Sequence, residues 1–299
     1  MDKTNKLSTF LTEDIAYFLG LVVGRGVIIK GTEVNKLVIE FPFKNLEAQG
    51  VTKKYNTQMY LSESLDKIVN RLRKLGLNIR KESDAENKTA SLIIEWYGED
   101  ITWQLLNYLL DKEHTDYHSF RIPQSIFEAD KEKQKEFLRG YFDVTGYIRT
   151  SNARFGQKDQ QRVYLEVDHR NWFLVLDLYR LFDIVGVPIE SIDFGHPNFR
   201  DPEFKKPAGF WAKEHQIKIF ANQFLPIGSY LTHKEEVLKE LAAMNKSDLG
   251  EGEKSIRVKE KPQNPEENSE KLPEFLRGKH FNHYTELLDY LALIDKNNE

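Results

Sequence analysis

One pattern occurs twice in this sequence, as Phe137-Leu138-Arg139-Gly140-Tyr141-Phe142-Asp143-Val144-Thr145-Gly146 and as Phe18-Leu19-Gly20-Leu21-Val22-Val23-Gly24-Arg25-Gly26. Each copy is an apolar helix that ends at a glycine and runs directly into a β-like segment. We expect Gly26 and Gly146 to take the left-handed conformation that stops a helix. Three glycines inside the copies remove side chains and allow another backbone to come close: Gly20, Gly24 and Gly140. The pattern therefore predicts two helices that pack at short range.

Length and composition limit the class of protein. A chain of 299 residues with 40% hydrophobic residues has a soluble globular profile and holds one large domain or two ordinary ones. The N-terminus is polar, and no apolar run reaches the roughly 18–20 residues that span a bilayer. The absence of cysteine excludes disulfides and fits a reducing cytoplasm, where we expect the protein to reside. A net charge of -4 argues against a simple basic nucleic-acid binder but leaves room for a local basic face.

The segments that follow the two copies have the same order of predicted elements. After the first copy we predict strands at 27–30 and 36–42, a helix at 61–75 stopped by Gly76, strands at 77–81 and 90–97, and a helix at 101–110. After the second copy we predict strands at 147–155 and 161–168, a helix at 172–185 ending at Gly186, strands at 189–194 and 215–220, and a helical turn at 223–230. The repeat predicts an α+β fold of two related αββαββα halves.

The predicted elements divide the chain into four parts. The first half covers residues 10–115, and the second covers 116–244 with a further helix at 233–244. Residues 245–271 are polar and contain proline, so we expect a linker there. Residues 272–299 form a C-terminal helical element with an apolar face that consists of Leu287, Leu288, Leu291 and Ile294. We favour docking of that face on the main domain. The alternatives are recruitment of a protein partner and membership of a helix-turn-helix appendage.

This arrangement resembles the LAGLIDADG homing-endonuclease family in its single-chain form with two similar halves. The resemblance covers roughly residues 10–240 and rests on the two motif copies and the matching element order. It implies that the two motif helices form the interface between the halves and that the strands form a saddle over the major groove of DNA. It also implies that one monomer spans both halves of a non-palindromic site. In the family, acidic residues just before the last glycine of each motif bind divalent metal at the scissile phosphates.

The chain departs from the family pattern at both metal-binding positions, which Arg25 and Thr145 occupy. Because Mg²⁺ prefers anionic oxygen ligands, the permanent charge of Arg25 would repel the ion and the neutral Thr145 would hold it weakly. Asp143 lies two positions before Thr145, and we favour a helix-interface or capping role for it over catalysis. We therefore expect no cofactor and no efficient cleavage.

Binding of DNA does not depend on the missing acids. Alternation on a strand puts residues i and i+2 on one face, so basic side chains on the predicted strands can meet DNA together. Glu40, Glu166 and Asp168 weaken such a basic face locally. The candidate DNA-binding residues are Arg25, Lys30, Lys36, Arg80, Lys81, Arg149, Arg154, Lys158, Arg162 and Lys213. The resulting prediction is sequence-specific binding of double-stranded DNA, as a regulator or a recognition subunit.

Two alternative functions stay open. The chain is an active Mg²⁺-dependent DNA endonuclease if Asp143, Asp14 or Glu13 act as displaced metal ligands. It is a protein-interaction scaffold if the potential over the saddle is neutral or negative. His114 and His118 have the i, i+4 spacing of a metal site, but no third ligand stands near them in the sequence, and we expect no metal there.

Overall fold

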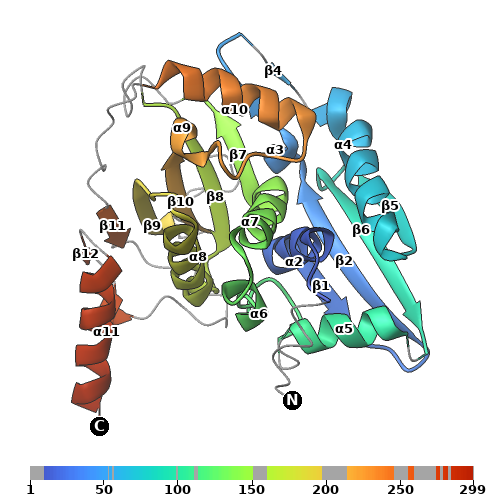
Figure 1. Cartoon of the computed structure of the whole chain (residues 1–299), viewed down its shortest axis with the longest axis horizontal. Coiled ribbons are helices and arrows are strands. Elements are labelled where there is room, and N and C mark those ends of the chain that lie inside the picture. Colours follow the sequence, from blue (N-terminus) through green and yellow to red (C-terminus); the bar gives the residue numbers. More distant parts are fainter. Residues whose placement is uncertain are drawn as a thin grey trace.

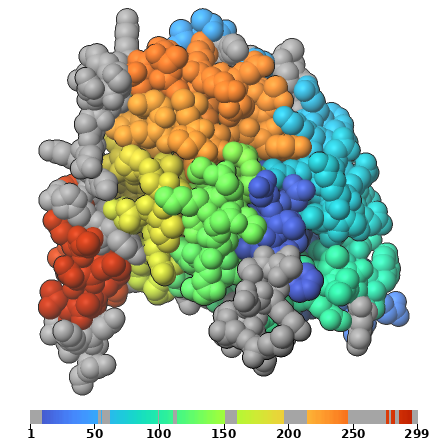
Figure 2. All heavy atoms as spheres, viewed as in Figure 1, coloured from blue at the N-terminus to red at the C-terminus, as the bar shows by residue number. Residues whose placement is uncertain are grey.

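We analysed a computed structural model of the chain, which describes residues 10–52, 54–55, 57–98, 100–110, 114–150, 160–196, 214–245, 255–258, 274–276, 279–281 and 284–298. In Figure 1 the helices α2 (Glu13–Arg25) and α7 (Lys131–Thr145) lie side by side at the centre, between the two halves. Figure 2 shows helices from both halves forming the face seen from this side. Among the described residues, no helix combines the length and hydropathy needed to cross a bilayer.

The first half builds a four-stranded antiparallel sheet in the order β1-β2-β6-β5. Its strands are β1 (Gly26–Ile29), β2 (Val34–Pro42), β5 (Ile79–Asp84) and β6 (Thr89–Tyr97). Its further helices are α4 (Thr57–Leu72), which continues as the 3-10 turn η1 (Arg73–Leu75), and α5 (Ile101–Leu109). Leu37, Ile39 and Phe41 alternate along β2 and are fully buried, so this side of the sheet faces the helices.

The second half repeats this topology. Its strands are β7 (Gly146–Arg149), β8 (Arg162–Asp168), β9 (Ser191–His196) and β10 (Glu214–Phe220), and their order β7-β8-β10-β9 matches β1-β2-β6-β5 position by position. The helices are α6 (Gln124–Phe127), α8 (Trp172–Val185), α9 (Ala221–Phe224) and α10 (Thr232–Met244). The predicted α+β fold of two pseudo-symmetric halves is confirmed.

Two additions that we did not predict extend the second sheet to eight strands. From the first half come α3 (Phe43–Leu46), β3 (Ala48–Gln49) and β4 (Lys54–Tyr55), and β3 pairs in parallel with β7. From the C-terminal part come β11 (Ser255–Val258), which pairs with the edge strand β9, and β12 (His280–Phe281). The expectation of a linker throughout 245–271 is therefore wrong at β11. A four-residue strand in a polar segment gives no periodic signal, and the open edge of β9 supplies its hydrogen-bond partners.

The C-terminal part also contains η3 (Glu274–Leu276) and α11 (Tyr284–Asn298). One side chain of the predicted apolar face of α11, Leu287, is fully buried, whereas Leu288 is 42% exposed. The hydroxyl of Tyr290 donates a hydrogen bond to the carbonyl of Phe275 at 2.8 Å. The face is therefore only partly covered.

The two motif helices approach each other at their internal glycines, as predicted. A Cβ atom on Gly20 would lie 2.1 Å from the carbonyl oxygen of Phe137, and one on Gly140 would lie 2.1 Å from the carbonyl oxygen of Tyr17. Any side chain at either position would push the helix backbones apart. The interface between the halves therefore depends on both glycines.

The glycines that end the motif helices do not take the conformation that we expected. Gly26 and Gly146 both have φ of -82°, which is extended and not left-handed. Glycine is needed there for space, because a Cβ on Gly146 would lie 2.0 Å from the ring of Phe142. The left-handed stops are instead Gly76 and Gly186, with φ of 76° and 79°.

Candidate nucleic-acid interface

Each sheet has one face that the helices leave uncovered, which we call the outer face. On β2 it carries the residues that alternate with the buried ones, including Lys36 and Glu40. On the second sheet, register places Tyr147, Tyr164 and Lys218 in one row across β7, β8 and β10. The next rows hold Glu166 beside Gln216, and Asp168 beside Glu214. The outer face of the second sheet is therefore polar, although most of these side chains are buried.

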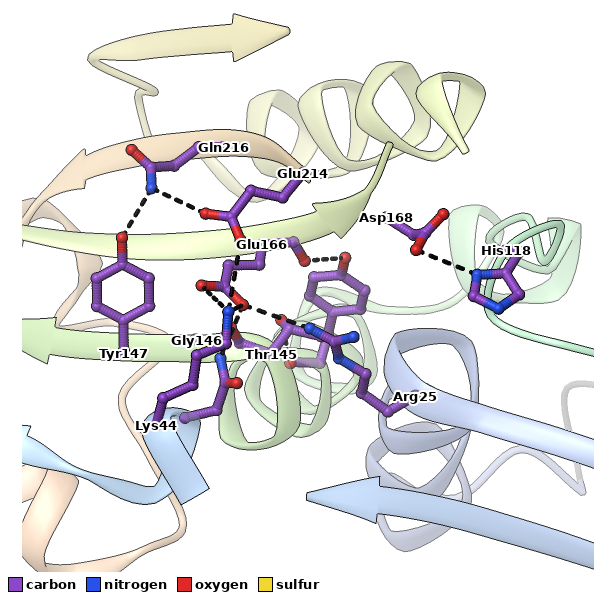
Figure 3. A network of polar contacts seen from close by, with 12 residues as sticks. Arg25, Lys44, His118, Thr145, Gly146, Tyr147, Glu166, Asp168, Glu214 and Gln216 are labelled. Carbon is purple, nitrogen blue, oxygen red and sulfur yellow. Dashed lines mark hydrogen bonds and ion pairs between the residues drawn. The ribbon is translucent and has the colours of Figure 1, made fainter. Parts of the chain in front are cut away.

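A group of charged side chains gathers where the motif helices end, and Figure 3 shows it from close by. We call it the helix-end cluster, made of Arg25, Lys44, Asn45, Glu166 and Glu214. Arg25, the last residue of α2, lies 3.3 Å from the carboxylate of Glu166. Lys44, from α3, lies 2.8 Å from Glu166 and 3.5 Å from Glu214. Strand β8 thus presents one carboxylate to two cations from the first half.

Asn45 ties the cluster to the end of the second motif helix. Its amide donates to the carbonyl of Thr145 at 2.5 Å and to the Glu166 carboxylate at 3.3 Å. The hydroxyl of Thr145 turns away from the cluster and donates to the carbonyl of Tyr141, one turn back in α7, at 2.7 Å. Thr145 therefore contributes its backbone carbonyl to the cluster, and its side chain caps the helix.

The two carboxyl groups of the cluster differ in protonation. Burial opposes the charge of Glu166, but Lys44 and Arg25 hold its pKa below the usual value. Burial and the Glu166 charge raise the pKa of Glu214 to about 8. Glu214 therefore holds its proton more strongly than Glu166 does, which reduces the negative charge that faces Arg25 and Lys44. The cluster thus places two cations beside two carboxyl groups at the ends of the motif helices.

A second polar group adjoins the cluster on β8. His118 Nδ1 lies 3.2 Å from Asp168, and the guanidinium of Arg170 contacts both side chains. Although burial opposes it, hydrogen bonds from His118 and Arg170 hold the pKa of Asp168 well below its usual value. Within the described part of the chain, no three histidine or carboxylate side chains are placed to hold a metal ion.

The predicted basic residues are largely engaged by other groups of the chain. Arg154, Lys158 and Lys213 lie outside the described residues. Lys36 lies 3.0 Å from Glu95, and Arg162 donates to Glu190 at 2.8 Å. Arg80 contacts Glu82 and lies 3.7 Å from Glu95. Arg149 stands on the outer face of the second sheet, and its guanidinium lies 5.3 Å from the ring centre of Tyr147. Lys30 is exposed and directly follows β1.

The assignment of Lys81 to the DNA-facing surface is wrong. Arg80 lies opposite Ile93 on the outer face of the first sheet, so its neighbour Lys81 points to the helix side. There the ammonium of Lys81 contacts Asp66 of α4. Alternation along β5 is the physical reason, since two consecutive strand residues cannot share a face.

The acids that could have served as displaced metal ligands do not meet. Asp143 is fully buried and accepts hydrogen bonds from Tyr17 at 2.8 Å and from Ser229 at 2.5 Å. Asp14 pairs with Arg71 at 2.7 Å near the start of α2. That end of the 13-residue helix, which also holds Glu13, lies about 18 Å from Arg25. The three acids therefore do not lie together at one place, and Asp143 joins α2, α7 and the segment before α10.

Sequence reasoning missed Lys44 and Glu214 and named Glu166 only as a weak point of a basic face. The spacing of Glu166 and Asp168 at i, i+2 on a predicted strand was the available signal, because it puts two carboxylates on one face. Lys44 follows a predicted strand that ends at Pro42, and nothing in its neighbourhood marks it as the partner of a residue in the other half.

These features define a two-half LAGLIDADG-like fold. They are the two motif helices packed through Gly20 and Gly140, the strand order repeated in both sheets, and the contact of Gly24 with the end of the second motif helix.

Comparisons with known proteins were made by sequence and by structure. No family model matches the chain. A probable translation initiation factor IF-2 from Methanocaldococcus jannaschii is 30% identical over 96 residues, which are 32% of this chain and 8% of that protein. The chain thus spans less than a tenth of the length of this relative.

Similar solved structures include I-DmoI in complex with DNA and Mn, at 13% identity and a TM-score of 0.39, covering 76% of this chain and 98% of that chain. Full-length DUF199/WhiA from Thermatoga maritima has 15% identity and a TM-score of 0.42, covering 78% of this chain and 59% of that chain. The N-terminal LAGLIDADG domain of DUF199/WhiA has 13% identity and a TM-score of 0.37, covering 77% and 91%. Because these identities and TM-scores are low, the assignment of the fold rests on the helices and strands of this chain itself.

Proposed function

We propose that the chain binds double-stranded DNA along the outer faces of its two sheets and recognises a specific, non-palindromic site without efficient cleavage. The observation that carries this proposal is the helix-end cluster, where Arg25 and Lys44 face Glu166 at 3.3 and 2.8 Å. The two cations, together with the raised pKa of Glu214, favour a phosphate over Mg²⁺ at this place. DNA binding through this cluster needs no metal cofactor, and the chain acts as a monomer because both halves are present.

The outer faces offer groups that can read base edges. Arginine and glutamine side chains pair with guanine and adenine in the major groove, and carboxylates accept from cytosine. Arg149 and Arg162 stand on the second outer face, and Lys36 and Arg80 stand on the first. Gln216 also lies on the second face but is buried and donates to the hydroxyl of Tyr147 at 2.7 Å. Exposed ion pairs such as Lys36 with Glu95 contribute only about 0–1 kcal/mol, so a phosphate can replace the carboxylate at little cost.

The experiment that tests this function combines selection and cleavage. The purified protein is incubated with a randomised duplex library in Mg²⁺ or Mn²⁺, and bound and cut molecules are sequenced. Enrichment of one asymmetric site without cutting is the expected result. Cutting at a defined position would overturn the claim of an inactive centre, and absence of enrichment at every salt concentration would overturn DNA binding.

A second candidate function, a protein-interaction scaffold, is favoured by the charge of the first outer face. Lys36 and Arg80 stand there against Glu40, Glu82 and Glu95, so acids outnumber bases among the described charges of β2, β5 and β6 on this face. The same face exposes Ile29 by 50% and Tyr97 by 66%. Capture of a protein through this face, together with no DNA enrichment, is the result that would favour the scaffold.

A further inference from the structure

A pocket outside the outer faces lies between α4 of the first half and α10 of the second. Its volume is about 180 Å³, and its lining includes Ser64 and Lys67 from α4 and Thr232, His233 and Glu236 from α10. In Figures 1 and 2 one end of α10 lies against α4 at the surface. None of these residues belongs to the helix-end cluster, so the pocket is a separate site.

His233 is held in one orientation at this pocket. Its Nε2 lies 2.7 Å from the carbonyl oxygen of Leu46. Because a carbonyl oxygen can only accept, Nε2 carries the hydrogen and Nδ1 is left as a basic nitrogen. Nδ1 lies 3.5 Å from the hydroxyl of Ser64. A hydroxyl, a base that can take its proton and a group that orients the base are the three parts of an activated serine nucleophile.

His233 is unprotonated at neutral pH, although burial also makes it a weaker base than an ordinary imidazole. Burial lowers the pKa of His233 to about 4, so the imidazole is neutral over most of the physiological range. Ser64 and His233 are 4% and 5% exposed, so water competes little for the contact between them. The Ser64 hydroxyl therefore meets an unprotonated base at neutral pH.

Lys67 supplies a positive charge to the same pocket. It follows Ser64 by three residues on α4, a spacing that places both side chains on one helix face. Its ammonium donates to the hydroxyl of Thr232 at 2.9 Å and lies 4.7 Å from the ring centre of Tyr230. The Ser-x-x-Lys spacing is one that known serine acyltransfer sites use on a helix.

We propose that Ser64 is the nucleophile of an acyl-transfer site in this pocket, with His233 as its general base and Lys67 as the cation for the oxyanion, and that its substrates are esters of short acyl chains. The pocket volume of about 180 Å³ suits an acetyl to butyryl group with the alcohol portion outside. The site functions independently of DNA binding, because none of its residues lies on an outer face.

The reaction balances without a metal or an oxidant. Ser64 Oγ bonds to the acyl carbon while its proton passes to His233 Nδ1, and the carbonyl oxygen becomes an oxyanion that attracts Lys67. The bond to the leaving alkoxide then breaks, and the alkoxide takes the proton from His233. Water attacks the acyl-Ser64 ester by the same route, which releases the carboxylic acid and restores Ser64.

The test uses the full chain with diisopropyl fluorophosphate, followed by mass spectrometry, and with p-nitrophenyl acetate as a chromogenic ester. One diisopropylphosphoryl group on Ser64 is the expected result, and this readout needs no variant. Ser64→Ala should abolish labelling, and His233→Gln should slow it about 100-fold, which is the usual contribution of a general base. Ser62→Ala is the matched control, because Ser62 lies on the same helix, is exposed and should leave the labelling rate unchanged.

The pH profile separates this site from unspecific acylation. Because the pKa of His233 is lowered to about 4, the rate should be level from about pH 5.5 to 8. Acylation of surface lysines would instead rise steadily with pH. Absence of label on Ser64 in the intact protein, equal labelling of Ser64→Ala and the original chain, or a rate that rises throughout this range would each overturn the proposal.

Discussion

The two halves share one topology but differ in how their outer faces carry charge. On the first sheet the ion pairs are exposed, as in Lys36 with Glu95, where the side chains are 42% and 25% exposed. On the second sheet the pair of Lys44 with Glu166 has exposures of 29% and 3%. Exposed pairs exchange partners easily, whereas a buried carboxylate depends on the cations that it already has. The same fold therefore offers an adaptable surface in one half and a fixed one in the other.

The largest effect that distinguishes the two faces should come from removal of the buried carboxylate. Glu166→Ala leaves Arg25 and Lys44 together without their shared anion, and we expect a loss of about 3–5 kcal/mol in the free energy of unfolding. Glu95→Ala is the matched change on the first sheet and should cost about 0–1 kcal/mol. Urea denaturation of both variants measures the contrast, and equal losses would remove it.

The interface between the halves can be strained without touching either outer face. Gly20→Ala places a Cβ against the backbone of α7, and we expect a loss of up to about 3 kcal/mol because a backbone cannot rotate away. Gly24→Ala is the control on the same helix, since its Cβ would lie 2.6 Å from a methyl group of Val144, which is a side chain. The midpoint temperature of thermal unfolding should be clearly lower for Gly20→Ala than for Gly24→Ala. The reverse order would contradict the packing described.

The buried face should also show a pH dependence that the exposed face lacks. The native chain holds the Glu214 proton up to about pH 8, whereas an unfolded chain releases it near pH 4.3. Between these values the native state binds more protons, so this group makes stability fall as pH rises. In the original chain the urea midpoint should therefore be lower at pH 8 than at pH 5. Glu214→Gln should remove this contribution and make the difference between the two midpoints smaller. An unchanged difference between the two midpoints would show that Glu214 ionises normally.

The smallest effect concerns the two faces of the first sheet. If Lys36 meets a DNA phosphate, Lys36→Ala should lower the slope of log affinity against log salt by about 0.9. Lys81→Ala removes the same charge from the helix side of the sheet and should leave the slope unchanged. Binding to the enriched duplex at several salt concentrations measures both. Equal slopes for the two variants would place DNA elsewhere than on the first outer face.

The local sequence pattern predicted the long helices and strands in which hydrophobic residues recur at a regular spacing. The helix expected at 172–185 is α8 with the same bounds, and Gly186 ends it in the left-handed conformation. Strands β3, β4 and β11 were missed because two to four residues cannot show alternation, and because β3 and β11 pair with strands far away in the chain. Sequence alone predicted the close approach at Gly20 and Gly140 but assigned the wrong cause to Gly26 and Gly146.

The candidate site was predicted less well than the fold, for a physical reason. Arg25 and Thr145 could be placed at the helix ends because a motif fixes their position along the chain. Their neighbours Lys44 and Glu214 meet Glu166 only through strand register and through a short helix that reaches across to the other half. A contact between residues separated by more than a hundred positions leaves no mark in local composition.

The pairing of β3 with β7 has a consequence for how this chain can be divided. If the halves arose from a duplicated gene, each copy could once have been exchanged as a cassette. Here β3 of the first half pairs with β7 of the second sheet. Lys44, from the helix that precedes β3 in the chain, neutralises the buried Glu166 of the second half. A hybrid made by joining one half to a foreign partner would lose both. The two halves therefore depend on each other for a complete sheet and for the charge balance of Glu166, and neither half is a self-sufficient unit.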